Sequence, residues 1–507
     1  MSNNYTIAID QSTSATKAML FNSDCKMLFR STIPHEQIYP QAGWVEHNAE
    51  EIYQNTLLAV KNVLAVGILQ ANDHFSVAIT NQRETVVVWN RETGKPAYNA
   101  VVWQCQRGAE ICKTLVDNGF NDIFKQKTGL LIDPYFSASG IRWILDNVEN
   151  ARALAIDGKL LAGTIDSWLL WKLTAGKVHA TDYTNASRTL LFNIHTLNWD
   201  DELLQIFDIP RNMLPAVKPC DTIFGESNFE GILDKSVSIA GIIGDSHGAL
   251  AGQMCFAKGM GKATYGTGSS LMVNIGETPA KAPEGLVTSV GFAAFGKVFY
   301  AYEGNVHCTG ATIKWLKEEL QIIENEKETE AIALSISDNG GVYFVPAFAG
   351  LGAPWWNPNA KAAISGMTLG TGKAHVVRAA IEAIAYQIKD LCDLIQQQSG
   401  VSLKELRVDG GPTKNGFLMQ FQSDMLDTPI NVSEIEEASA LGAVLMNGLA
   451  LGKWQNFTDI EQLRTKNNIV YPKMENNIRK QLYNGWIKAL NQLKVETPPQ
   501  APPKEGM

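Results

Sequence analysis

Tyr5-Thr-Ile-Ala-Ile-Asp10, Gln11-Ser-Thr-Ser-Ala-Thr-Lys17 and Ala18-Met-Leu-Phe21 follow one another directly near the start of the chain. The first run is rich in β-favouring residues and ends in an acid, the second is small and polar, and the third is apolar again. This order predicts a strand, a polar turn and a second strand, that is, a hairpin with hydroxyl groups at its tip. Such a turn lets backbone N–H groups and hydroxyls approach an anion closely.

The stretch Lys262-Ala-Thr-Tyr-Gly-Thr-Gly-Ser-Ser-Leu-Met-Val-Asn-Ile275 has the same order of strand, small polar turn and apolar strand. This internal echo predicts two halves of related topology. The 507-residue length agrees, because one core stops growing at roughly 250–300 residues. We expect domains at 1–250 and 251–495, packed around a cleft because no low-complexity linker separates them, and a disordered proline-rich tail at 496–507.

Helical and strand patterns alternate around the two hairpins, which predicts the α/β class. A capping box at Asn48-Ala-Glu-Glu51 predicts the start of a helix. A later apolar stripe at helical spacing predicts a long helix from Ala374 that ends at Gly400. Further elements are expected as strands at 76–80, 85–89 and 406–411 and a helix from about 415.

Composition excludes several functions. The net charge of -9 provides no basic surface for nucleic acid or an anionic membrane. No run approaches the roughly 18 apolar residues of a membrane span, and the N-terminus does not resemble a secretory signal. Seven widely spaced cysteines without a CxxC pair predict reduced thiols and a cytoplasmic location. The sequence contains no HxH or HExxH pair, so it gives no indication of a metal-binding cluster.

Three turns rich in Gly, Ser and Thr, at 10–17, 265–270 and 409–415, each follow an expected strand. One such turn alone is more often ordinary, but three together favour a nucleotide cleft. Asp10 could hold Mg²⁺ beside the phosphates, and Lys17 could neutralise charge there. The P-loop, the dinucleotide-binding fingerprint and the protein-kinase motifs are all missing from the sequence.

A second group of polar and aromatic residues occurs at expected strand exits, where α/β proteins place ligands. An Arg–Glu pair with an aromatic wall suits a small polyhydroxylated molecule, and an aspartate could accept a hydroxyl proton. Ordinary alternatives are a surface ion pair for Arg83–Glu84, core packing for Trp103 and a helix cap for Asp245. The group consists of Gln82, Arg83, Glu84, Trp103, Tyr135 and Asp245.

Taken together, these residues resemble the FGGY family of carbohydrate kinases, and within it the kinases that act on glycerol. The resemblance runs from about residue 5 to about 490. Its densest blocks are IAIDQSTSATKAMLF, YPQAGWVEHNAEEIY, ITNQRETVVVWNRETGKPAYNAVVWQ, TGLLIDPYF, HATDYTNASRTLLFNIHTLNWD and LRVDGGPTKNGFLMQFQSDML. It implies two actin-like (ribonuclease H-like) domains around an ATP and polyol cleft, and a homodimer or homotetramer.

The resemblance also implies a reaction, namely transfer of the γ-phosphoryl group of ATP to a terminal hydroxyl of a small polyol such as glycerol. Asp245 would be the catalytic base, and Asp10 would lie near Mg²⁺. The other implied roles are acceptor binding by Gln82, Arg83, Glu84, Trp103, Tyr135, Ser246 and Ser270, and ATP binding by Thr13, Ser14, Lys17, Thr267, Gly310, Lys314, Gly411 and Asn415.

Several residues depart from the pattern of the glycerol-specific members, among them Ser12, Lys17, Gly140 and Lys314, and two of the departures fall in the expected acceptor pocket. Ser246 stands where they usually have Gln, and Ser270 stands where they usually have Phe. Both changes predict a larger and more polar pocket. The alternative acceptor is therefore a four- or five-carbon polyol or ketose such as erythritol or xylulose. A rival of another class is an actin-like ATPase without a small substrate, and the retained Arg83, Glu84, Trp103, Tyr135 and Asp245 favour the kinase.

Overall fold

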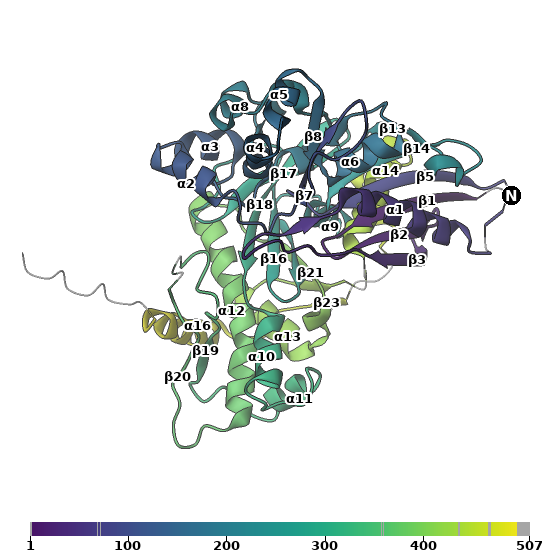
Figure 1. The fold of residues 1–507 in the computed structure, drawn as a ribbon. Helices are drawn as coiled ribbons and strands as arrows, with labels where there is room; N and C mark the ends of the chain where they lie inside the picture. The colour runs from purple at the N-terminus through teal and green to yellow at the C-terminus, as the bar shows by residue number, and fades with distance from the viewer. Residues whose placement is uncertain are drawn as a thin grey trace, which may run out of the picture.

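The computed structural model describes residues 3–67, 69–70, 72–355, 357, 359–433, 435, 437–464 and 468–493. The chain forms two large sheets with helices around and between them (Figure 1). The α/β class expected from the sequence is confirmed. The predicted tail at 496–507 lies outside the described residues.

The first sheet begins with the predicted hairpin. Strand β1 (Asn4–Gln11) pairs antiparallel with β2 (Ala15–Phe21), and β2 pairs antiparallel with β3 (Met27–Pro34). On the other side, β1 pairs parallel with β5 (His74–Asn81), which pairs parallel with β14 (Val237–Gly244). The edge strand β13 (Ile223–Ser227) is antiparallel to β14. The carboxyl ends of β1, β5 and β14 therefore meet at one edge.

The second sheet repeats this arrangement. Its hairpin is β15 (Met260–Tyr265) and β16 (Ser269–Gly276), and β16 pairs antiparallel with β18 (Lys297–Val306). Strand β15 also pairs parallel with β21 (Glu405–Asp409), which pairs parallel with β22 (Ile430–Val432). The order β18-β16-β15-β21-β22 thus matches β3-β2-β1-β5-β14 in sequence order and direction. Edge strands β17 (Val287–Ala294) and β23 (Asn468–Val470) complete the sheet.

Two helices lie between the sheets and join the halves. Helix α9 (Asp245–Gly252) follows β14, and α14 (Ala438–Ala450) comes from the C-terminal part of the chain yet packs on β14, β5 and β1 (Figure 1). One apolar cluster joins Ala8 of the first sheet, Leu250 of α9, Met272 of the second sheet and Leu445 of α14. The chain therefore crosses back into the first half after residue 437. The boundary predicted near residue 250 stays a prediction.

Asn447 fixes α14 to the first sheet. Its Nδ2 group donates to the backbone oxygens of Val77 at 3.1 Å and Ala240 at 2.9 Å, and its Oδ1 accepts from the Ser76 hydroxyl at 2.9 Å. The Ala240 oxygen is free because the β14–β5 register shifts here. Gly241 has φ 76, and a Cβ there would lie 2.3 Å from the Asn447 backbone nitrogen, so only glycine permits this approach.

The predicted helix starts are largely confirmed. Helix α1 (Ala49–Leu64) is capped by Asn48, whose side chain accepts from the N–H groups of Glu50 and Glu51. A capping box also requires the Glu51 side chain to accept from the Asn48 backbone N–H. This part of the prediction is wrong, because the Glu51 carboxylate accepts from the Glu36 backbone N–H instead. The long helix α12 (Lys373–Ser399) ends at Gly400, which has φ 68.

The remaining elements surround the two sheets. Strands β4 (Glu46–His47), β7 (Ala100–Val101), β6 (Val86–Asn90) and β8 (Leu160–Thr164) form a four-stranded sheet. The short pairs are β10 (Phe192–Asn193) with β11 (Asn198–Trp199), β9 (Ala180–Asp182) with β12 (Ala216–Lys218), and β19 (Tyr343–Val345) with β20 (Ala363–Ser365). The other helices are α2 (Ala109–Asp117), α3 (Asn121–Thr128), α4 (Ser137–Asn147), α5 (Ala151–Ile156), α6 (Ile165–Leu173), α7 (Tyr183–Ala186), α8 (Asp201–Phe207), α10 (Gly310–Glu318), α11 (Glu328–Leu334), α13 (Gly416–Leu426), α15 (Phe457–Glu461) and α16 (Asn476–Asn491).

Candidate active site

The three parallel strands of the first sheet place the predicted charged residues at one edge. Asp10 lies near the end of β1, Arg83 and Glu84 follow β5, and Asp245 follows β14 as the first residue of α9. Register pairs Asp10 with Thr80 and Gly244 with Asn81, so the strand ends are adjacent. Gly244 has no room for a side chain, because a Cβ there would lie 2.7 Å from Arg83 Cγ.

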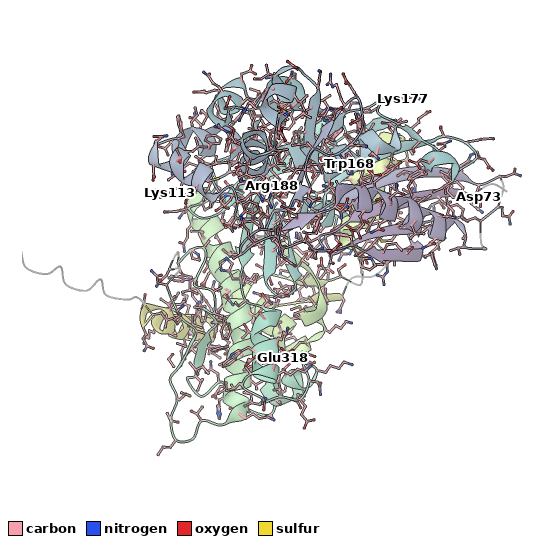
Figure 2. All side chains as sticks on the ribbon, viewed as in Figure 1. Asp73, Lys113, Trp168, Lys177, Arg188 and Glu318 are labelled. Atoms are coloured by element: carbon pink, nitrogen blue, oxygen red, sulfur yellow. The ribbon has the colours of Figure 1, made fainter. Side chains whose placement is uncertain are left out.

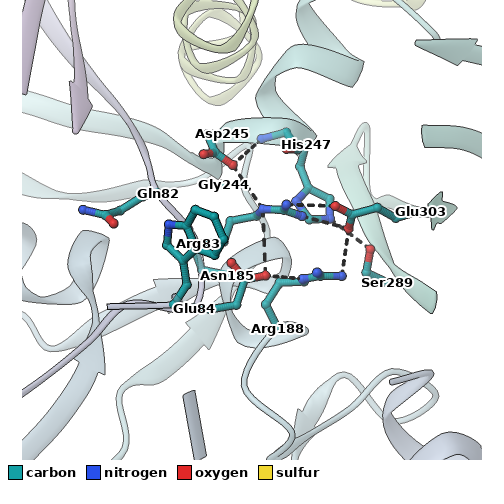
Figure 3. Close-up of polar contacts among 12 residues, drawn as sticks. Gln82, Arg83, Glu84, Asn185, Arg188, Gly244, Asp245, His247, Ser289 and Glu303 are labelled. Atoms are coloured by element: carbon teal, nitrogen blue, oxygen red, sulfur yellow. Dashed lines mark hydrogen bonds and ion pairs between the residues drawn. The ribbon is translucent and has the colours of Figure 1, made fainter. Parts of the chain in front are cut away.

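Arg83 lies at the centre of a buried ionic network (Figure 3). Its Nη1 and Nη2 atoms donate to the two carboxylate oxygens of Glu303, both at 2.9 Å, and its Nε lies 3.1 Å from Asp245 Oδ1. Arg188 donates from Nε to Glu84 at 2.6 Å and places Nη1 2.8 Å from Glu303. Two arginines therefore hold two glutamates, and Asp245 lies at the rim of the network.

Burial and neighbouring charges shift the pKa values of the buried glutamates in opposite directions. Burial alone would raise the pKa of Glu303, but Arg188 and Arg83 outweigh it and hold that pKa well below its usual range. For Glu84 burial prevails over the same two arginines, and its pKa is raised. Burial also lowers the pKa of His247 well below its usual value, so this ring is neutral beside Ser289, whose hydroxyl lies 3.0 Å from its Nε2.

Two aromatic rings lie next to this charged group. Trp103 and Tyr135 pack edge to face with ring centroids 5.5 Å apart, and both are half-buried. The Trp103 indole N–H donates to the Thr13 hydroxyl at 3.0 Å, which links the ring to the first polar turn. Core packing is thus not the whole role of Trp103. The two rings form a wall suited to the C–H face of a polyol.

Gln82 is placed differently from its predicted neighbours. It is buried, its amide nitrogen donates to Gln11 Oε1 at 2.9 Å, and its amide oxygen accepts from the Thr85 hydroxyl at 2.9 Å. Both ends of the amide therefore have protein partners, and Gln82 supports the strand ends. A direct contact between Gln82 and a ligand stays a prediction.

The two serines that depart from the family pattern both lie near this region. The Ser246 backbone N–H donates to Asp245 Oδ1 at 2.5 Å. Ser270 pairs in register with Thr264, and its hydroxyl lies 3.4 Å from the Nζ atom of Lys262. Lys262 is 1% exposed, and its ammonium also donates to the Thr264 hydroxyl at 3.3 Å. The surroundings of the Ser270 hydroxyl are therefore polar.

The first polar turn holds Asp10 and Lys17 together. Lys17 Nζ lies 3.4 Å from Asp10 and 2.9 Å from Glu437, which also pairs with Arg30 at 2.7 Å. Burial raises the pKa of Asp10 to about 6, although Lys17 opposes this shift. The hydroxyls of Thr13 and Ser14 lie at the turn, where Thr13 is half-buried and Ser14 is exposed.

The second half contributes a cavity of about 1100 Å³. Its apolar wall includes Ile313, Trp315, Ile384 and Leu418, which suits a flat heterocyclic base. All five residues that sequence reasoning assigned to the nucleotide in this half line the cavity: Thr267, Gly310, Lys314, Gly411 and Asn415. Figure 2 shows Glu318, another lining residue, well below Arg188 of the ionic network.

Two of these lining residues already have protein partners. The Lys314 ammonium lies 3.6 Å from Glu318 but is largely exposed. The Asn415 oxygen caps α13 by accepting from the Leu418 N–H at 2.9 Å, and its amide nitrogen donates to Thr329 at 3.1 Å. Asn415 thus fixes the start of α13 at the cavity wall.

Sequence reasoning missed four charged residues of the site, namely Arg188, Lys262, Glu303 and Glu437. Glu303 had a signal, because it is the one acid in strand β18 (Lys297–Val306), whose residues after Lys297 are otherwise uncharged. Arg188 and Glu437 had none, since their partners Glu84 and Lys17 are far away in the sequence. Lys262 lies in the second predicted hairpin, but its burial could not be read from the sequence. In the described part of the chain, no group of three metal-binding side chains occurs, and no helix is long and apolar enough to cross a membrane.

Two matching α/β halves, one with acids and cations at its strand ends and one with a nucleotide-sized cavity, define a kinase of small molecules. The comparisons with known proteins agree. Residues 5–252 match the N-terminal domain, and residues 261–451 the C-terminal domain, of the FGGY family of carbohydrate kinases. The chain belongs to this family, whose members are ATP-dependent phosphotransferases.

Similar proteins cover nearly the whole chain. A glycerol kinase of Thermotoga maritima is 51% identical over 97% of this chain and 100% of its own length. A glycerol kinase of Bacillus velezensis is 48% identical over 96% of this chain and 98% of its own length. The crystal structure of Plasmodium falciparum glycerol kinase with ADP superimposes with a TM-score of 0.93 at 36% identity, covering 98% of this chain and 99% of that one.

Proposed function

We propose that this protein transfers the γ-phosphoryl group of ATP to a terminal hydroxyl of glycerol, giving glycerol 3-phosphate and ADP. The observation that carries the proposal is the Asp245 carboxylate, 36% exposed, held 3.1 Å from Arg83 Nε at the edge of the first sheet. A partly exposed carboxylate among buried ion pairs can reach a substrate hydroxyl. The names of the similar proteins support glycerol as the acceptor.

In this proposal the acceptor hydroxyl gives its proton to Asp245 as its oxygen attacks the γ-phosphorus, and the bond to the leaving ADP breaks. General-base assistance of this kind contributes about 10²–10⁴-fold. Arg83 and Glu84 bind the acceptor hydroxyls, while Trp103 and Tyr135 cover its C–H face. Enclosure between the halves excludes water, which would otherwise compete as the acceptor.

Mg²⁺ is part of the proposal, and the residues fit it. Magnesium is usually held by one or two carboxylates together with substrate phosphates rather than by an all-protein cage. Asp10, 5% exposed at the first turn, is such a carboxylate. When bound, the ion would neutralise phosphate charge. Lys17 supplies further positive charge, and the turn hydroxyls of Thr13 and Ser14 supply hydrogen bonds.

A coupled assay that follows ADP release tests the function. We expect turnover with glycerol and ATP, and none when either is omitted. Turnover of ATP that is independent of every polyol would instead identify an ATPase without a small substrate.

A second candidate is a longer acceptor, favoured by the polar contact between Ser270 and Lys262. Loss of a hydrophobic contact the size of one or two methylenes changes the discrimination between a short and a longer acceptor by only about 1–3 kcal/mol. A panel from glycerol through erythritol to xylulose, compared by kcat/KM, separates the two candidates. A preference for glycerol by orders of magnitude would eliminate the longer acceptor.

We also propose a cytoplasmic homo-oligomer, a dimer or tetramer. All seven cysteines are free, which fits a reducing compartment. Light scattering of the purified chain gives the oligomeric state directly.

A further inference from the structure

Glu303 belongs to the second sheet, yet its carboxylate lies among residues of the first half. It is on β18, where it pairs in register with Met272 of β16. Arg83 and Arg188, by contrast, come from the first half, following β5 and α7. Figure 3 shows the Glu303 side chain reaching both guanidinium groups. The acceptor site is therefore completed by a residue from the opposite sheet.

The contacts leave Arg83 little freedom. Glu303 takes both terminal nitrogens of its guanidinium group at 2.9 Å, a bidentate arrangement that fixes the plane as well as the position of the group. Because a guanidinium is rigid and planar, this also fixes the position of Nε, which forms an ion pair with Asp245 Oδ1 at 3.1 Å. The remaining arginine, Arg188, is held by the same carboxylate and in turn holds Glu84.

The charges within the network balance only when Glu303 is ionised. Arg83 and Arg188 carry two positive charges, and Glu84 and Glu303 carry two negative charges, all on side chains that are 2–6% exposed. Without Glu303, one buried cation would lose its partner. That arginine would then pair with Asp245 or Glu84, the remaining carboxylates of the network, and the acceptor needs both of them.

We infer that Glu303 is a positioning residue of the acceptor site, which holds Arg83 beside Asp245 and keeps Asp245 and Glu84 available to the acceptor. This inference rests on the proposed function. The nucleotide cavity lies apart from the network, since none of Arg83, Glu84, Arg188 and Glu303 lines it. Removing the Glu303 charge should therefore weaken use of the acceptor without weakening nucleotide binding.

The test compares Glu303→Gln with Glu382→Gln in the full-length protein. Glu382 is a matched control because it is 1% exposed and binds Arg378 at 2.8 Å and Asn339 at 2.8 Å in the second half. We expect Glu303→Gln to lower kcat/KM for glycerol by about 30-fold or more, the effect of breaking a buried charge pair. ADP affinity, measured by calorimetry without acceptor, should stay unchanged. Glu382→Gln should lower thermal stability while leaving kcat/KM for glycerol unchanged.

A double-mutant cycle separates positioning from general loss of structure. If Glu303 acts through Arg83, adding Glu303→Gln to Arg83→Gln should cost little more than Arg83→Gln alone. Full additivity, or equal kcat/KM for glycerol in Glu303→Gln and wild type, would overturn the inference. If Glu303→Gln does not fold, Glu303→Asp decides, because it keeps the charge but withdraws it by one methylene. Unchanged kcat/KM in that variant would also overturn the inference.

The same assays keep the two proposals apart. Wild-type protein that phosphorylates no polyol would refute the proposed function. An active wild type beside an equally active Glu303→Gln would refute only the role of Glu303.

Discussion

The two sheets have the same strand order but carry different chemistry at equivalent positions. In the first sheet β1, β5 and β14 lead to Asp10, Arg83 and Asp245. In the second sheet the equivalent β15 and β21 lead to Tyr265 and to the glycines that follow Asp409. The first half therefore holds acids and cations in a buried network, and the second holds open space for a ligand. One topology supports two tasks because different residues stand at the ends of equivalent strands.

The largest expected effect comes from removing the base of the first half. Asp245→Asn keeps the size of the side chain but removes the proton acceptor, so kcat should fall by about 10²–10⁴-fold. ADP binding by calorimetry should remain near the wild-type value, since the cavity is lined by the second half. Activity near wild type would show that Asp245 is not the base. It would also contradict the assignment of catalysis to the first half and of nucleotide binding to the second.

The converse change acts on the second half. A Cβ at Gly411 would meet no atom within 4 Å, so Gly411→Val folds without a clash and projects into the nucleotide cavity. We expect ATP binding to weaken by about 2 kcal/mol, roughly 30-fold, as for other overpacked sites. KM for glycerol, measured at saturating ATP, should change little. Equal losses for both substrates would show that the halves are not separable.

The pH dependence of the half-saturating Mg²⁺ concentration should reveal the role of Asp10 in the first polar turn. Because burial raises the pKa of Asp10 to about 6, its carboxylate is mostly ionised at pH 7 and mostly protonated at pH 5. Protons then compete with Mg²⁺, so the half-saturating Mg²⁺ concentration should rise about 10-fold from pH 7 to pH 5. Kinetic titration with Mg²⁺ at each pH measures this. A constant half-saturating concentration would mean that Asp10 does not hold the ion.

The smallest expected effect concerns Ser270, a residue of the second sheet that we expect beside the acceptor. Ser270→Phe replaces a hydroxyl beside Lys262 with a ring and narrows the pocket. The ratio of kcat/KM for glycerol to that for erythritol should rise roughly fivefold, which corresponds to a change in discrimination of about 1 kcal/mol. Ser270→Ala serves as the control, since it removes the hydroxyl without filling space. No change in the ratio would show that Ser270 does not contact the acceptor.

Much of this architecture could be predicted from local sequence. Both hairpins were evident as β-rich runs around small polar turns, and the N-cap Asn48 and the terminating Gly400 marked helix ends. These features depend on residues within a few positions of one another. The strand-end residues Asp10, Arg83 and Asp245 could be singled out for the same reason, because each lies at or just after the end of a recognisable strand.

Other features could not be predicted because their partners are distant. Lys17 pairs with Glu437, 420 residues later, and Arg83 pairs with Glu303, 220 residues later. The return of α14 to the first sheet also has no local signal, since its anchor Asn447 bonds to backbone atoms of β5 and β14. Such contacts arise only when the two sheets pack around α9 and α14.

The sequence by itself determined which chemical groups stand at the end of each strand, because alternation and turn composition are local properties of the chain. The tertiary structure decided which of those groups are paired and which remain free to act. Asp245 keeps an accessible carboxylate because Glu303 of the opposite sheet occupies both terminal nitrogens of Arg83. Buried charges take their partners from whatever the packing brings within reach, and that is set by the fold as a whole.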